Sequence, residues 1–151
     1  MKKLFLLLML ATLFNACKMG TPKNGDAKNL EIDLKDKVLS DSANFTTIEW
    51  LDSTYMDMGK VVKGQMLDVV FHFRNTGNKP LIISQVTASC GCTVPETPKE
   101  PFAPGAEGEI RARFNSAGQT PGPHRKSVYV TANTTPNTYN VLDFNADVTE
   151  N

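Results

Sequence analysis

From Phe45 onward, apolar and polar residues alternate with a period of two, which is typical of half-buried β-strands. The clearest run covers residues 67–74 and places four apolar side chains on one face: Leu67, Val69, Phe71 and Phe73. Residues 75–78 (Asn-Thr-Gly-Asn) predict a turn in which Gly77 can adopt a positive φ. Residues 80–86 then predict the returning strand of a hairpin, with a proline at its first position.

The same alternation returns further along the chain. Residues 107–114, 124–132 and 142–148 each predict a strand, and residues 47–50 and 55–59 predict two shorter ones. Glycine and proline mark the connections between them. About seven short strands at a spacing of roughly 8–12 residues indicate an all-β, antiparallel β-sandwich. A small barrel is the alternative, and we prefer the sandwich.

The N-terminus follows a different pattern. Lys2 and Lys3 precede an apolar run, residues 4–13, that is interrupted by a single threonine. This run is shorter than the roughly 20 apolar residues that span a bilayer, and it fits the hydrophobic region of a signal peptide. The following Phe-Asn-Ala-Cys sequence is similar to a lipobox, with Ala16 as the small residue before the cut and Cys17 as the lipidated residue. An ordinary signal peptide that is cleaved elsewhere is the alternative.

Residues 18–42 are polar and contain Gly20, Pro22 and Gly25, which predicts a flexible tether. We therefore expect a lipoprotein signal peptide at 1–16, lipidated Cys17 and a tether at 17–44, and one β-domain at 45–151. Acyl chains on Cys17 would attach the protein to a bacterial membrane. The expected location is the cell envelope, with the domain in the periplasm or exposed at the surface.

Composition narrows the range of partners. Hydrophobic residues make up 40% and charged residues 21% of the 151-residue chain, as in one ordinary globular domain. Sixteen basic residues balance sixteen acidic ones, and removal of the signal peptide with its two lysines leaves 14 against 16, a formal net charge of −2. Because nucleic-acid binding needs a strongly basic surface, we expect no nucleic-acid partner.

Several short motifs resemble the bacterial family DUF1573 over roughly residues 45–149. They are residues 71–77 (Phe-His-Phe-Arg-Asn-Thr-Gly), 80–83 (Pro-Leu-Ile-Ile), 89–93 (Ser-Cys-Gly-Cys-Thr), 104–105 (Pro-Gly), 108–114 and 146–148. The resemblance implies an immunoglobulin-like sandwich of the type found in PapD-like chaperones and in ciliary proteins such as Hydin. It also supports the envelope location, and it implies no particular activity.

Two cysteines, Cys90 and Cys92, remain when Cys17 carries lipid, and they are separated only by Gly91. Three interpretations stay open. An oxidising compartment favours a short-range disulfide between them. Two thiolates could instead bind copper(I) or contribute half of a zinc site. Finally, the thiols could pack as small apolar groups in a structural loop.

A metal site would need further ligands, for which the sequence offers two histidines and three methionines: His72, His124, Met56, Met58 and Met66. Each also has a structural interpretation, which we prefer: a surface position for the histidines, and core packing for Met56 and Met58. We likewise assign Trp50 to packing. We therefore expect no cofactor, with copper or zinc as the alternative.

No catalytic constellation is recognisable, because Ser89 has no histidine or acid in a partner motif. We expect a non-enzymatic, lipid-anchored binding or scaffolding module that recruits an envelope protein. Sheet edges often recruit such partners by strand addition. The alternative is a thiol redox or copper- or zinc-handling protein that uses Cys90 and Cys92.

Overall fold

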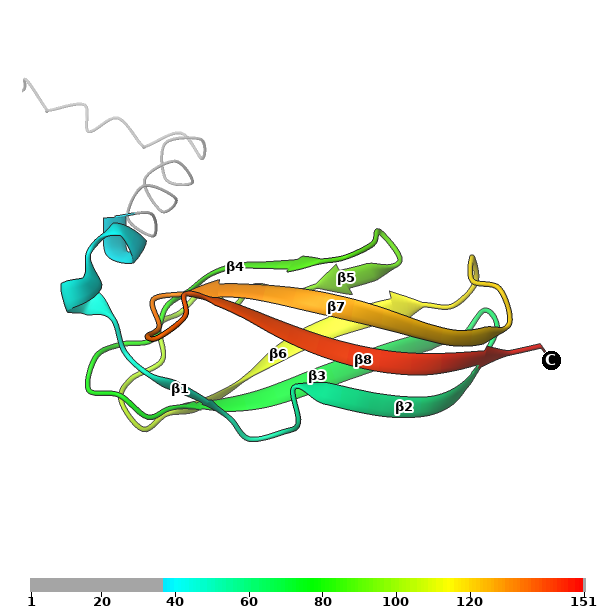
Figure 1. Ribbon diagram of the computed structural model, residues 1–151, viewed down its shortest axis with the longest axis horizontal. Helices are drawn as coiled ribbons and strands as arrows, with labels where there is room; N and C mark the ends of the chain where they lie inside the picture. The colour runs from blue at the N-terminus through cyan, green and yellow to red at the C-terminus, as the bar shows by residue number, and fades with distance from the viewer. Residues whose placement is uncertain (1–36, 151) are drawn as a thin grey trace, which may run out of the picture. The chain divides into compact units, whose positions relative to one another are not determined.

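The computed structural model describes residues 37–150 and contains eight β-strands (Figure 1). The strands are β1 (Ile48–Trp50), β2 (Tyr55–Val62), β3 (Met66–Asn75), β4 (Ile83–Ala88), β5 (Thr93–Pro95), β6 (Glu107–Asn115), β7 (Gly122–Ala132) and β8 (Tyr139–Thr149). A short 3₁₀ helix, η1 (Ser42–Asn44), precedes them at the end of the predicted tether. The predicted signal peptide and Cys17 lie outside the described residues.

The strands form two four-stranded sheets that pack face to face. The first sheet has the order β1-β3-β6-β5, and the second has the order β2-β8-β7-β4. Figure 1 shows the long strands β3 and β6 lying across from β7 and β8. The sandwich predicted from the period-two pattern is therefore confirmed.

Both long strands of the first sheet point their apolar positions inward, because alternate residues of a strand face opposite sides of the sheet. Phe71 lies opposite Ile110, and Val69 lies opposite Ala112, in the β3–β6 ladder. All four of these side chains are buried. Across the sandwich, the rings of Phe114 and Phe144 meet edge to face at 5.8 Å between centroids. Aromatic contacts of this kind add to the burial of apolar area that stabilises the fold.

The connection after β3 differs from the predicted hairpin. β4 does not pair with β3; it pairs with β7 in the second sheet. Asn133, which follows β7, explains the crossing: its side chain accepts a hydrogen bond from Ile82 N–H (2.7 Å) and donates one to Pro80 C=O (2.9 Å). These bonds hold the backbone before β4 against the second sheet.

The pairing of the shorter strands also departs from the prediction. β2 runs parallel to β8, whereas the predicted sandwich was wholly antiparallel. The chain crosses from the first sheet to the second between β1 and β2, so that β2 enters beside β8 in the same direction. β5 has three residues and was not predicted, because so short a segment shows no periodicity.

Buried polar side chains close one end of the sandwich. The Asn75 side chain donates to the C=O groups of Lys79 (2.8 Å) and Phe102 (3.0 Å), and it accepts from Thr46 Oγ1 (2.8 Å) and Gly77 N–H (3.1 Å). Every buried side-chain nitrogen and oxygen among residues 37–150 has a hydrogen-bond partner. This end is therefore closed by a satisfied network, which is the condition under which burial of polar groups is tolerated.

Candidate functional site

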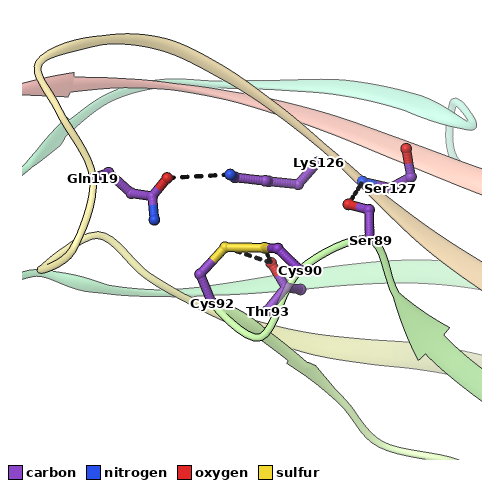
Figure 2. Close-up of a disulfide and its surroundings, with 7 residues drawn as sticks. All are labelled: Ser89, Cys90, Cys92, Thr93, Gln119, Lys126 and Ser127. Atoms are coloured by element: carbon purple, nitrogen blue, oxygen red, sulfur yellow. Dashed lines mark hydrogen bonds between the residues drawn. A yellow bond between two sulfur atoms is a disulfide. The ribbon is translucent and has the colours of Figure 1, made fainter.

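The conspicuous cysteine pair lies in the connection from β4 to β5. The Sγ atoms of Cys90 and Cys92 are joined in a disulfide, with 5.3 Å between the Cα atoms (Figure 2). Both cysteines are half-buried, whereas Gly91 between them is exposed. The Thr93 hydroxyl lies 3.8 Å from Cys90 Sγ. The two sulfur atoms therefore lie in a tight surface loop.

Hydrogen bonds hold this loop to both sheets. Ser89 N–H donates to Ser127 C=O (2.9 Å), and the Ser89 hydroxyl oxygen accepts from Ser127 N–H (3.1 Å), both on β7. Asn115 N–H on β6 donates to Cys92 C=O (2.8 Å). The Ser89 hydroxyl thus holds the loop against β7, and the loop as a whole carries the chain from one sheet to the other.

A lysine approaches the loop from the core side. Lys126 Nζ donates to Gln119 Oε1 (3.1 Å) and lies 5.8 Å from the centroid of the Phe114 ring. Figure 2 shows this pair of side chains in the surroundings of the disulfide. The apolar stem of Lys126 thus covers the end of the core while its ammonium group keeps a polar partner.

The structure separates most of the nominated metal ligands from the cysteines. Met66 lines a surface cavity together with Cys92. His72 lies six positions further along β3 than Met66, which corresponds to about 20 Å of strand. Among residues 37–150, no group of three or more His, Cys, Asp or Glu side chains is arranged to hold a metal ion.

The remaining nominated residues have structural roles. Met56 and Met58 on β2 pack against the core, as predicted. Trp50 packs edge to face on Phe73, with 5.7 Å between ring centroids. His124 Nε2 lies 2.7 Å from Thr120 C=O. These contacts give each of these side chains a structural role that needs no bound ligand.

The outer face of the first sheet carries rows of paired charges. Arg74 binds Glu107 (2.5 Å), and Arg111 binds Glu109 (2.6 Å). At the edge of this face, Asp52 Oδ2 accepts hydrogen bonds from His72 N–H and lies 2.7 Å from His72 Nδ1. These bonds from the backbone and the side chain of His72 lower the pKa of the Asp52 carboxyl group.

One half of β6 lacks a neighbour on its outer edge. β5 pairs with the stretch from Ala112 to Phe114 only. The last backbone hydrogen bond on this side runs from Glu96 N–H to Arg111 C=O (2.9 Å), after which the chain leaves the sheet. Backbone groups two residues apart point the same way in a strand, so Glu109 and Glu107 present their N–H and C=O groups to this open side.

A groove of about 550 Å³ lies along this open edge. Its wall on one side is β6, and on the other side it is the segment from Glu96 to Pro98 with Phe102. This volume is in the range of ligand pockets in proteins. The groove and the adjacent disulfide loop together form the candidate site.

Sequence reasoning found the cysteines and missed the groove. The signal for the groove is the proline spacing after Cys92: Pro95, Pro98 and Pro101. Proline has no N–H to donate to a ladder, so a strand cannot continue through this segment. A short β5 beside a nine-residue β6 leaves an uncovered edge.

Comparison with known protein families identifies the family of this chain. The family model described as "Protein of unknown function (DUF1573)" matches residues 48–148. The chain belongs to this family, as its motifs predicted. A comparison with curated proteins gives no match.

Solved structures agree on the fold. The chain is similar to a protein of unknown function from Porphyromonas gingivalis W83, with 19% identity and a TM-score of 0.61 over 71% of this chain and 49% of that one. It therefore spans about half the length of that protein. It is also similar to the ASH / PapD-like domain 7 of human CEP192, with 8% identity and a TM-score of 0.57 over 72% of this chain and 89% of that chain. A third similar structure is the YadV chaperone, with 14% identity and a TM-score of 0.50 over 67% of this chain and 51% of that chain. The fold is thus a PapD-like, immunoglobulin-like sandwich.

Proposed function

We propose that the protein is a lipid-anchored module of the bacterial cell envelope that binds another envelope protein. The observation that carries this proposal is the uncovered half of β6 with its groove, because an unpaired strand edge offers a row of backbone donors and acceptors to a partner. The PapD-like fold is compatible with such a role but does not define it, since one fold serves many functions.

The anchor is the second part of the proposal. Residues 4–13 and Ala16-Cys17 supply the signal and the lipidation site. No helix among residues 37–150 is long and apolar enough to cross a membrane. Acyl chains on Cys17 would attach the protein to the membrane.

Two measurements in bacterial cells test this function. Labelling with a radioactive fatty acid should mark the wild-type chain and not the Cys17→Ser variant. A photo-cross-linking amino acid at exposed positions on both sheet faces, such as Glu109 and Tyr139, should give a discrete adduct with one envelope protein. Absence of the label would contradict the anchor, and absence of any discrete adduct would contradict the binding function.

The disulfide supports a second candidate function, thiol redox exchange. The observation that favours it is the placement of Cys90 and Cys92 in a surface loop around the exposed Gly91. A partner dithiol would reduce the bond by thiolate attack on one sulfur, releasing the other as a thiolate, and a second attack would leave the partner oxidised. Copper or zinc binding would require this reduced form, with Met66 as the nearby additional ligand.

Mass spectrometry after thiol alkylation in intact cells tests this candidate. A redox role predicts that the fraction of reduced Cys90 and Cys92 changes when cells meet an oxidant or reductant. A fraction that stays fully oxidised under both treatments would contradict it and leave the disulfide a structural role.

A further inference from the structure

We propose that residues 107–111 of β6 bind an extended segment of the partner protein as an added strand, and that this segment alternates basic with apolar residues. This inference rests on the proposed binding function and specifies its site and the chemistry of its partner. It follows from three features of the first sheet: an unprotected edge, an acidic groove and an apolar wall.

The edge of β6 differs from the other edges of the sandwich. β2 carries a bulge between Asp57 and Lys60, and bulges and lysines discourage strand addition. The edge of β4 is occupied, because Leu81 N–H bonds Phe102 C=O (2.9 Å) and Val86 N–H bonds Thr97 Oγ1 (3.1 Å). β6 has neither a proline nor a lysine, and its register with β3 is continuous.

β3 also extends beyond its short neighbour β1, so the first sheet has two uncovered half-edges. On β3, the Asp52 carboxylate already occupies the backbone N–H of His72 (2.7 Å). On β6, the large groove lies directly beside Glu107 and Glu109. We therefore assign the binding edge to β6 rather than to β3.

The charges around the groove favour a basic segment. Three carboxylates line the groove: Glu107 is paired with Arg74, and Glu109 is paired with Arg111, whereas Glu96 is the third. Three carboxylates against these two guanidiniums leave a formal charge of −1. Glu96 forms no ion pair with any residue in the range 37–150. Basic side chains on an added strand would lie opposite Glu107 and Glu109, an arrangement of cross-strand charges that stabilises sheets.

The inner side of the edge favours apolar residues at the intervening positions. Gly108 has no side chain, and a Cβ there would collide with the rings of Phe102 and Phe73. The half-buried Phe102 ring therefore lies against the backbone of β6 and forms the apolar wall of the groove. Alternate residues of an added strand would point toward this ring, because side chains alternate across a strand.

The test uses the full chain in a non-ionic detergent and a capped seven-residue peptide in which lysine and valine alternate. Titration followed by NMR gives the Kd. Glu109→Pro removes the outward-facing N–H without removing a bond to β3, so it should weaken binding at least tenfold. Glu109→Thr keeps the N–H and loses one charge, and should weaken binding about threefold.

Three controls separate the edge from general effects. Val70→Pro changes the uncovered edge of β3 in the same sheet, and we expect its Kd to stay within twofold of the wild-type value. A peptide with glutamate in place of lysine should bind at least tenfold more weakly, as should a peptide of the same composition with its lysines and valines in separate blocks. Thermal unfolding of each variant verifies that it is folded.

Several results would overturn the proposal. Glu109→Pro could bind the alternating peptide as the wild type does, or Val70→Pro could lose as much affinity as Glu109→Pro. A dimer of the full chain that Glu109→Pro dissociates would show that the edge pairs with a second copy instead. A discrete cross-linked partner in cells, together with unchanged peptide binding by Glu109→Pro, would support the binding function and refute this site. The absence of any cross-linked partner in cells, together with weakened peptide binding by Glu109→Pro, would refute the binding function.

Discussion

The two halves of β6 have the same alternation of residues and different surroundings. From Ala112 to Phe114 the strand is paired on both sides, with β3 and with β5. From Glu107 to Arg111 it is paired with β3 and faces a groove on its other side. The inner face is apolar in both halves, so the period-two pattern does not distinguish them.

The difference originates in the segment before β6. The Cys90–Cys92 loop directs the chain out of the second sheet and starts β5 beside Phe114. Two prolines that follow β5, Pro98 and Pro101, then prevent it from continuing along β6. The covered half serves stability, and we propose that the uncovered half serves binding. The following predictions are ordered from the largest expected effect to the smallest.

Removal of the Phe114 ring from the covered half should have the largest effect on stability. Phe114 is fully buried and packs on Phe144, so Phe114→Ala should lower the free energy of unfolding by about 3–5 kcal/mol. Urea unfolding would measure this change. Glu109→Thr in the uncovered half is the matched control, with an expected change within about 0.5 kcal/mol. Equal losses from both variants would contradict the role of the Phe114 ring in the core.

Asn75→Ala tests the support of the groove wall. The substitution leaves the Lys79 C=O, the Gly77 N–H and the Thr46 hydroxyl without their partner, whereas the Phe102 C=O keeps its bond from Leu81 N–H. Because unsatisfied buried polar groups cost about 1–3 kcal/mol each and partly rehydrate, we expect a loss of about 2–4 kcal/mol in the free energy of unfolding. Asn78→Ala, at an exposed position in the same turn, is the control and should be near neutral. Equal stability of the two variants would refute the role of the network.

The double substitution Cys90→Ser and Cys92→Ser tests the loop that starts β5. Loss of so short a cross-link should lower the free energy of unfolding by about 1–2 kcal/mol. The Asn115 amide, which bonds Cys92 C=O, should exchange its hydrogen faster. Unaltered exchange would show that the disulfide does not hold β5 in place. A change in oxidant or copper tolerance of the cells would favour the redox or metal-handling candidate instead.

The smallest effect concerns Asp52, next to His72. Its pKa is lowered in the folded state, so its contribution to stability is present above its unfolded pKa of about 3.9 and is lost as the pH falls through the folded pKa. The stability difference between the wild type and Asp52→Asn should therefore be larger at pH 7 than at pH 2.5. Chemical denaturation at both values measures it. A difference that grows on acidification would contradict the hydrogen-bonded carboxylate.

The strands that the sequence predicted are those whose inner faces alternate over several residues, as in β3, β6 and β8. The position of β4 could not be predicted, because the Asn133 side chain that bonds Ile82 and Pro80 is about fifty residues away in the sequence. Contacts between residues that are distant in the sequence also limit the prediction of the candidate site. The spacing of Cys90 and Cys92 is local and visible, whereas the open edge of β6 depends on which strand lies beside it.

Amide hydrogen exchange along β6 tests the central claim most directly. In the free chain, the Glu109 amide should exchange much faster than the Arg113 amide, although both lie in one strand with side chains on the same face. Addition of the lysine–valine peptide should slow exchange at Glu109 at least tenfold and leave Val70 unchanged. Slow exchange at Glu109 without the peptide, or no slowing with it, would contradict an open edge that accepts an added strand.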